Sequence, residues 1–147
     1  MPGTVLHGSC VALGPPACDP PRGVLILGPS GAGKSTLALR LMALGASLVA
    51  DDQVAISPDP DGPGLIARAP DTIRGLIEAR GVGLLGATAL AAAQLALVVD
   101  LGRDEAERLP PRRETVLLGR SLPLVLRVQH GHLDVAVLQW LRGGRVA

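Results

Sequence analysis

The chain has 147 residues, a net charge of +1 and 18% charged residues, and Trp140 is its only aromatic side chain apart from histidine. This length suits one domain, and so weak a charge without aromatic platforms argues against a nucleic-acid partner. The sequence has no uninterrupted apolar run of about eighteen residues, and its first residues lack the charged and apolar regions of a signal peptide. We therefore expect a cytosolic protein with no membrane partner.

The N-terminal part of the chain is predicted to contain a strand, a loop and a helix in direct succession. A first strand is expected over residues 5–13, and a proline-rich turn follows at 14–21. Residues 24–27 form a short, continuously apolar run that suits a buried parallel strand. Helical periodicity then covers residues 35–44 and ends at Gly45.

The loop between this strand and this helix carries a complete phosphate-binding motif, G-x-x-x-x-G-K-[ST]. Lys34 is the only lysine among 14 basic residues, and a compact ammonium on a flexible stem reaches phosphates in a way that a planar guanidinium does not. Backbone N–H groups and the start of the helix would cradle ATP or GTP, and the Ser35 hydroxyl would bind magnesium. The predicted nucleotide-binding residues are Gly28, Pro29, Ser30, Gly31, Ala32, Gly33, Lys34, Ser35 and Thr36.

The remaining pattern predicts an α/β domain with short elements and no repeats. A strand over 47–50, a hairpin, a short helix, two further strands and a closing helix are expected in this order. Their ranges are 47–50, 54–57 with 65–68, 71–79, 95–99, 124–128 and 133–141. The charged, proline-containing stretch 105–114 is expected to be mobile.

Two predicted strands end in an acid that could complete a magnesium site. Asp51 and Asp52 follow the strand over 47–50, and Asp100 follows the strand over 95–99. We favour the doubled acid, since one carboxylate could serve the ion while the other handles a proton. A solvated turn is the alternative for Asp51 and Asp52, and a turn cap is the alternative for Asp100.

Glu78 is a further candidate ligand. It precedes Arg80, Gly81 and Gly83 in an otherwise apolar stretch, a pattern that fits a backbone bend offering a carboxylate to a cation and a guanidinium to a phosphate. A surface turn fits the same residues equally well.

The cysteines and histidines do not predict another metal site. Cys10 and Cys18 lack metal-ligand spacing, so we interpret them as reduced packing or surface residues. His7, His130 and His132 are too few and too scattered for zinc.

In their order and rough spacing, four motifs together resemble the catalytic domain of the HPr kinase/phosphorylase family. They are His7-Gly8, the phosphate loop at 28–35, the segment 48–52 and the segment 77–83. The resemblance covers most of the chain and implies one P-loop kinase domain of the HPr kinase/PEP carboxykinase-like type over residues 1–147. That fold has a mixed sheet and a short C-terminal helical part. The family's N-terminal domain is expected to be absent, as in the short alphaproteobacterial form.

The resemblance implies an ATP- and magnesium-dependent kinase that phosphorylates a serine of the phosphocarrier protein HPr and can remove that phosphate by phosphorolysis. By this likeness, Lys34 holds the terminal phosphates of the nucleotide. Ser35, Asp51 and Glu78 serve the magnesium ion.

Three further roles are carried over from the family. Asp52 would be the base, since the family's proton acceptor is the second acid of its pair, and the reverse assignment to Asp51 stays open. His7 would be the catalytic histidine of the first strand. The segment Glu107-Arg108-Leu109-Pro110 is the nearest match to a mobile-loop Asp-Arg-Leu-Gly motif, which assigns a catalytic role to Arg108.

One segment departs from the family pattern. Gln129-His130-Gly131-His132 stands where the family has a proline-glycine-arginine segment tied to dephosphorylation, so phosphorolysis is left open. The resemblance also implies a homo-oligomer, a hexamer in the family. A small-molecule kinase and an ATP-binding regulatory module with little turnover remain as alternatives.

Overall fold

The computed structural model describes residues 3–147, which form eleven strands, two α-helices and one 3-10 helix. The strands are β1 (Thr4–His7), β2 (Ser9–Leu13), β3 (Arg22–Leu27), β4 (Ser47–Ala50), β5 (Gln53–Pro58), β6 (Leu65–Arg68), β7 (Leu76–Ala79), β8 (Gly83–Gly86), β9 (Ala93–Asp104), β10 (Arg113–Leu117) and β11 (Arg120–Arg127). The helices are α1 (Lys34–Ala43), the 3-10 helix η1 (Asp71–Ile73) and α2 (Leu133–Gly143).

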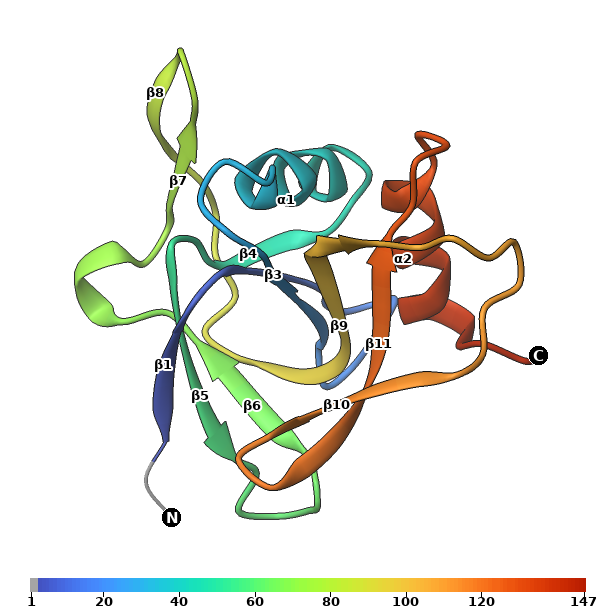
Figure 1. Ribbon diagram of the computed structural model, residues 1–147. Helices are drawn as coiled ribbons and strands as arrows, with labels where there is room; N and C mark the ends of the chain where they lie inside the picture. Colours follow the sequence, from blue (N-terminus) through green and yellow to red (C-terminus); the bar gives the residue numbers. More distant parts are fainter. Residues whose placement is uncertain (1–2) are drawn as a thin grey trace.

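Nine of these strands form one mixed sheet (Figure 1). Its main path runs β1-β5-β6-β9-β3-β2-β4, and β11 pairs with both β9 and β10. The pairs β3–β9 and β9–β11 are parallel, whereas the other pairs are antiparallel. The strand before the phosphate loop, β3, therefore lies inside the sheet between β9 and β2. This position confirms the buried parallel strand that its apolar run predicts.

Both faces of the sheet are covered, so alternate residues of β3 enter two separate hydrophobic clusters. Val24 and Ile26 pack with α1 and α2, and Leu25 points into the cluster on the opposite face. All three side chains are fully buried. Because the sheet is fixed on both sides, the loop that leaves β3 starts from a rigid base.

The first predicted strand is wrong as a single element. It divides at Gly8, after which the chain leaves β5 and pairs as β2 with β3 and β4. The Gly8 N–H donates to the carbonyl of Asp52, and a Cβ at this position would lie 2.7 Å from the Ile26 oxygen. This close approach leaves no room for a side chain at position 8. The pattern of apolar residues in the sequence does not show that the strand divides here.

The predicted helix over 71–79 is also wrong. Only residues 71–73 are helical, and residues 76–79 form β7, which pairs with β8 in a separate hairpin that projects from the body (Figure 1). Gly75 has φ 75° and Gly81 has φ 82°, and these left-handed conformations turn the chain into and between the two strands. Ile77 anchors the hairpin in the core that α1 covers.

The other predicted elements are confirmed with shifted ends. The strand over 47–50 and the 54–57 with 65–68 hairpin are present, the strand over 95–99 extends to 93–104, and both helices are found. The stretch 105–114, expected to be mobile, is ordered at its end, since β10 begins at Arg113 and pairs with β11. No helix within residues 3–147 is long and apolar enough to cross a bilayer.

Both cysteines are buried and carry free thiols, which confirms their assignment as packing residues. Cys10 has no exposed surface, and this burial raises its pKa to about 12. The thiolate is therefore strongly disfavoured in the folded protein.

Candidate active site

The loop between β3 and α1 folds into a cradle whose shape depends on two glycines. Gly31 and Gly33 have φ values of 84° and 98°, a left-handed region that other residues rarely adopt. This conformation brings the chain to the start of α1 at Lys34. Backbone N–H groups at a helix start are free of helical partners and favour an anion.

Lys34 turns back over this loop. Its Nζ donates to the carbonyls of Gly28 at 2.8 Å and Pro29 at 3.0 Å, and the residue is only 8% exposed. An ammonium has three donors, and within residues 3–147 no carboxylate forms an ion pair with Lys34. A nearly buried cation that lacks an anionic partner has a strong electrostatic reason to bind one.

Asp51 stands at the end of β4 and accepts hydrogen bonds from three different elements. Its Oδ1 accepts from the Ser9 hydroxyl and from the Ser35 hydroxyl, each at 2.7 Å. Its Oδ2 accepts from the backbone N–H of Glu78 at 3.0 Å. These donors satisfy a carboxylate that is only 4% exposed. Asp51 thereby links β2, α1 and β7.

Asp52 points in a different direction from its neighbour. It adopts φ 68°, and its side chain is 72% exposed. Its Oδ1 lies 3.3 Å from Nε2 of His7, which comes from the end of β1. The doubled acid is therefore divided into a buried member that holds the site together and an exposed member that solvent or a second molecule can reach.

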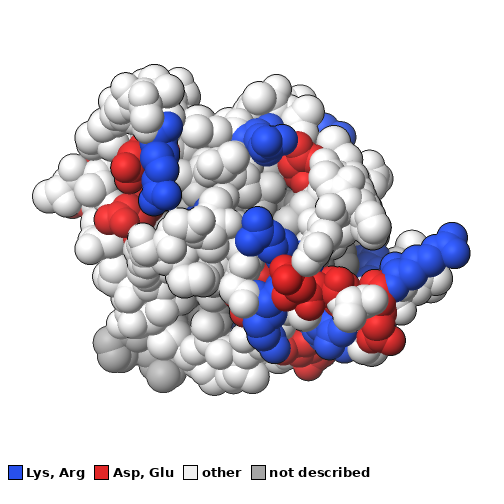
Figure 2. Space-filling model, turned by 45° about the horizontal axis from the view of Figure 1, so that its top comes forward, with Lys and Arg blue, Asp and Glu red and all other residues white. Residues whose placement is uncertain are grey.

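These groups surround one polar cavity of about 200 Å³. Its lining residues come from β1, β2, the phosphate loop, α1, the β4–β5 turn and the β7–β8 hairpin: His7, Ser9, Ser30, Gly31, Gly33, Lys34, Ser35, Thr36, Asp51, Asp52, Glu78 and Arg80. Figure 2 shows acidic and basic side chains adjoining on the side of the molecule from which the hairpin projects. The structure thus brings together His7, the doubled acid, Glu78 and most of the phosphate loop, whereas Gly28, Pro29, Ala32 and Arg108 do not line the cavity.

Arg80 supplies a second cation at this cavity. An added Cβ at Gly31 would lie 3.8 Å from Nη1 of Arg80, so the guanidinium stands beside the phosphate loop. This position agrees with the interpretation of the 77–83 segment as a bend that offers a carboxylate and a guanidinium to one site.

Asp100, the other acid considered, has a local role. Its two carboxylate oxygens accept from the N–H of Gly102 at 2.8 Å and from Nε of Arg103 at 3.2 Å. It does not line the polar cavity. The geometry therefore favours Asp51 and Asp52 over Asp100.

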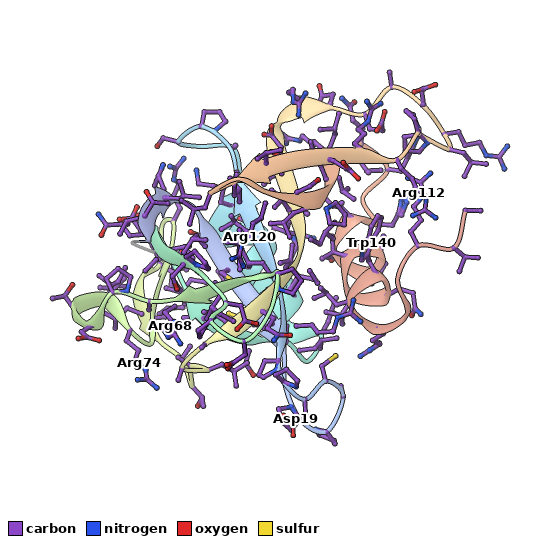
Figure 3. All side chains as sticks on the ribbon, turned by 90° about the horizontal axis from the view of Figure 1, so that it is seen from below. Asp19, Arg68, Arg74, Arg112, Arg120 and Trp140 are labelled. Atoms are coloured by element: carbon purple, nitrogen blue, oxygen red, sulfur yellow. The ribbon has the colours of Figure 1, made fainter. Side chains whose placement is uncertain are left out.

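Arg108 does not reach the polar cavity. It lies in the segment after β9 and lines a second, more apolar cavity together with His130, His132 and Trp140. Figure 3 places Trp140 and Arg112 on the same side of the molecule, where α2 and the C-terminal residues meet that segment. The catalytic role of Arg108 stays a prediction. His130 and His132 line this second cavity and not the polar one.

The segment that carries Arg108 is fastened by a bidentate ion pair. Arg113 donates from Nε to Glu105 Oε1 at 2.8 Å and from Nη2 to Glu105 Oε2 at 2.9 Å. The Arg113 guanidinium holds the pKa of Glu105 below its usual range. At pH values above the pKa that Glu105 has in the unfolded chain, the ion pair therefore stabilises the folded protein. This contribution is lost as the pH falls through the lowered pKa that Glu105 has in the folded protein.

We expect Glu105→Gln to lower the melting temperature at pH 7 by roughly 1–3 °C, because water still screens the pair in part: 30% of the Arg113 side chain and 8% of the Glu105 side chain are exposed. Melting followed by circular dichroism from pH 7 to pH 3 should show that the melting temperature of the variant falls less with decreasing pH than that of the unaltered protein. Glu107→Gln is the matched control, since Glu107 lies 3.5 Å from the same guanidinium and is 59% exposed. Equal behaviour of the two variants would contradict the assignment.

The donor set of the polar cavity fits magnesium. Ser35, Asp51 and Glu78 offer oxygen atoms, which hard divalent cations prefer. Among the described residues, no group of three or more His, Cys, Asp or Glu side chains is placed to hold a metal alone. A magnesium ion here would therefore take further ligands from phosphate oxygens and water.

Ser9 is the one residue lining the polar cavity that the sequence analysis did not identify as a candidate. It stands next to Cys10 at the start of an apolar strand, where a lone serine predicts nothing about a partner 42 residues away. The only available signal was the conflict between a polar residue and a fully apolar strand.

Comparison with known proteins places this architecture in a family. The model of the HPr Serine kinase C-terminal domain matches residues 3–116. The HPr kinase/phosphorylase of Azoarcus sp. (strain BH72) is 41% identical over 129 residues, which cover 79% of this chain and 41% of that protein. The HPr kinase/phosphorylase of Bordetella pertussis is 45% identical over 129 residues, with the same coverage.

A solved structure has the same fold over nearly the whole chain. The HPr(Ser) kinase/phosphatase from Coxiella burnetii superimposes with a TM-score of 0.74 at 23% identity, covering 95% of this chain and 94% of that one. The fold and the polar cavity define a mixed α/β domain in which a strand, a glycine-containing loop and a helix start line one side of the cavity. The chain belongs to the HPr serine kinase C-terminal domain family. It spans about two fifths of the length of the curated relatives named above.

Proposed function

We propose that this chain is an ATP- and magnesium-dependent serine protein kinase whose acceptor is an HPr-type phosphocarrier protein. The observation that carries the proposal is the division of the doubled acid. Asp51 is buried against Ser35, whereas Asp52 is exposed in the same cavity as Lys34. The relatives' name, HPr kinase/phosphorylase, supports the choice of reaction and acceptor.

In the proposed complex the phosphate loop and Lys34 hold the terminal phosphates. The two loop carbonyls that now accept from Lys34 Nζ keep the ammonium at the cavity, where it can turn toward an anion. Ser35, Asp51 and Glu78 would hold magnesium, which neutralises charge on the phosphate oxygens when bound. Arg80 would add a second positive charge from the hairpin.

Asp52 is proposed to accept the proton of the acceptor serine as its oxygen attacks the terminal phosphorus. A seryl hydroxyl needs a positioned base, and an exposed carboxylate is accessible to a hydroxyl on another protein. His7, 3.3 Å from Asp52, can donate a hydrogen bond that orients this carboxylate. The small cavity with its acid at the exposed rim favours an acceptor that enters from outside over a small molecule that must be enclosed.

Phosphorolysis would reverse these proton movements. Inorganic phosphate would attack the phosphorus of phosphoserine, the bond to the serine oxygen would break, and protonated Asp52 would return its proton to that oxygen. The products would be pyrophosphate and the carrier protein with its serine dephosphorylated.

The same proposal includes a single catalytic domain, a homohexamer and a cytosolic location. Light scattering tests the assembly.

Transfer from labelled ATP tests the proposal. Purified protein would be incubated with γ-labelled ATP, magnesium and a panel of phosphocarrier proteins, including a variant that lacks the acceptor serine. We expect label on the serine of the intact carrier only. Label on a metabolite would indicate a small-molecule kinase, and tight ATP binding without transfer would indicate a regulatory module. Pyrophosphate formed from phosphorylated carrier plus phosphate would demonstrate the reverse reaction.

A further inference from the structure

Ser9 is the least exposed polar residue at the polar cavity. It opens β2, is 1% exposed, and its hydroxyl is 2.7 Å from Asp51 Oδ1. The Ser35 hydroxyl lies at the same distance from the same oxygen. An ionised carboxylate can only accept, so both hydroxyls donate to it.

This arrangement has a consequence for Ser35. With its proton directed at Asp51, the lone pairs of the Ser35 oxygen are left for another partner in the cavity, and a divalent cation is such a partner. The orientation of Ser35 thus depends on where Oδ1 of Asp51 stands. Rotation of an aspartate carboxylate about its last torsion is otherwise broad and weakly restrained.

The donors to Asp51 come from β2, α1 and β7. Of these, the α1 donor is itself a candidate cation ligand, and the β7 donor is the backbone of another, Glu78. Ser9 is the donor with no task toward the cation. It can therefore hold Oδ1 in place when a cation draws on the Ser35 oxygen.

We propose that Ser9 is a positioning residue for the divalent cation that binds with the nucleotide, acting through Asp51 on Ser35. This inference rests on the proposed function, because it requires a nucleotide–magnesium site in the cavity. A serine that only satisfied a buried carboxylate would affect stability, whereas a positioning residue also affects how strongly the cation and the nucleotide support each other's binding.

The test measures this coupling without catalysis. The Kd of an imido-linked, non-hydrolysable ATP analogue is measured by calorimetry in EDTA and again in excess Mg²⁺. The Kd in EDTA divided by the Kd in Mg²⁺ is the ratio that reports the cation's contribution to binding. Ser9→Ala should reduce the ratio about tenfold, the low end of losses for residues that orient metal ligands. The Kd in EDTA should stay close to that of the unaltered protein.

Ser121→Ala is the matched control, because the Ser121 hydroxyl donates to Glu114 at 3.0 Å, another serine–carboxylate pair, on an exposed strand pair away from the cavity. It should leave the ratio unchanged. Ser9→Cys, nearly isosteric with a weaker donor, carries the test if Ser9→Ala does not fold, and it too should reduce the ratio.

The outcomes separate this inference from the function on which it rests. If Asp51→Asn reduces the ratio but neither Ser9 variant does, the role of Ser9 is overturned and the nucleotide–magnesium site stands. If the unaltered protein does not bind the analogue, or binds it equally with and without Mg²⁺, the proposed site itself is refuted and the inference with it.

Discussion

Lys34→Ala should abolish phosphoryl transfer from ATP, with a loss of more than about 1,000-fold in rate. The Lys34 ammonium is nearly buried and held by two loop carbonyls, so its charge is poorly screened by water where phosphates would bind. An alanine leaves the loop without its only lysine. Transfer of label from γ-labelled ATP to a carrier serine, together with nucleotide affinity from calorimetry, measures both losses.

Lys34→Arg is the informative companion to this variant. It keeps the positive charge but replaces a flexible ammonium with a planar guanidinium. That group cannot donate to the carbonyls of Gly28 and Pro29 in the same geometry. We expect a loss of transfer that approaches that of the alanine variant. Circular dichroism melting would establish that both variants fold. Unchanged transfer in folded Lys34→Ala would remove the phosphate-loop assignment.

Asp52→Asn should retain nucleotide binding and lose transfer by about 100- to 10,000-fold, the range expected for removal of a positioned base. The side chain of Asp52 is largely exposed, so its replacement leaves the buried network around Asp51 intact. An amide keeps the shape of the carboxylate but cannot accept the proton. Single-turnover transfer and analogue binding should therefore separate, with only transfer falling.

Asp51→Asn provides the contrast. Its amide could not accept both hydroxyl hydrogen bonds and the Glu78 N–H as the carboxylate does, so we expect weaker magnesium-dependent nucleotide binding. The two variants should thus fail at different steps. If Asp51→Asn eliminates transfer and Asp52→Asn does not, the roles assigned to the two acids are reversed.

The elements that adjoin the phosphate loop could be predicted because their signals are local. A continuous apolar run before the loop and helical periodicity after it predicted β3 and α1 to within a few residues. The helix prediction for residues 71–79 was wrong for the opposite reason. The apolar stretch is too short for a helical or a strand periodicity to be recognised, and non-local pairing with β8 decides that residues 76–79 form a strand.

The candidate site was predictable where a motif is contiguous and unpredictable where contacts are distant. The sequence marked Asp51 and Asp52 as a pair but did not distinguish their surroundings. Burial of one beneath Ser9 and exposure of the other beside His7 follow from the β4–β5 turn and from β1 joining β5. The position of Arg108 beside the second cavity could not be predicted either, since a motif-like match does not determine where a loop lies in space.

By itself the sequence determined the anion cradle, because the strand, the glycine turns, the lysine and the helix start are adjacent along the chain and their chemistry is set by neighbouring residues. Only the tertiary structure decided which acid is buried, which serine holds it and which cavity each arginine lines. Those outcomes depend on pairings between residues such as Ser9 and Asp51, 42 positions apart, and Glu78 and Asp51, 27 apart. The first pairing forms where β2 lies beside β4, and the second where the separate β7–β8 hairpin meets the end of β4. Non-local packing rather than local preference therefore fixes the positions of these side chains.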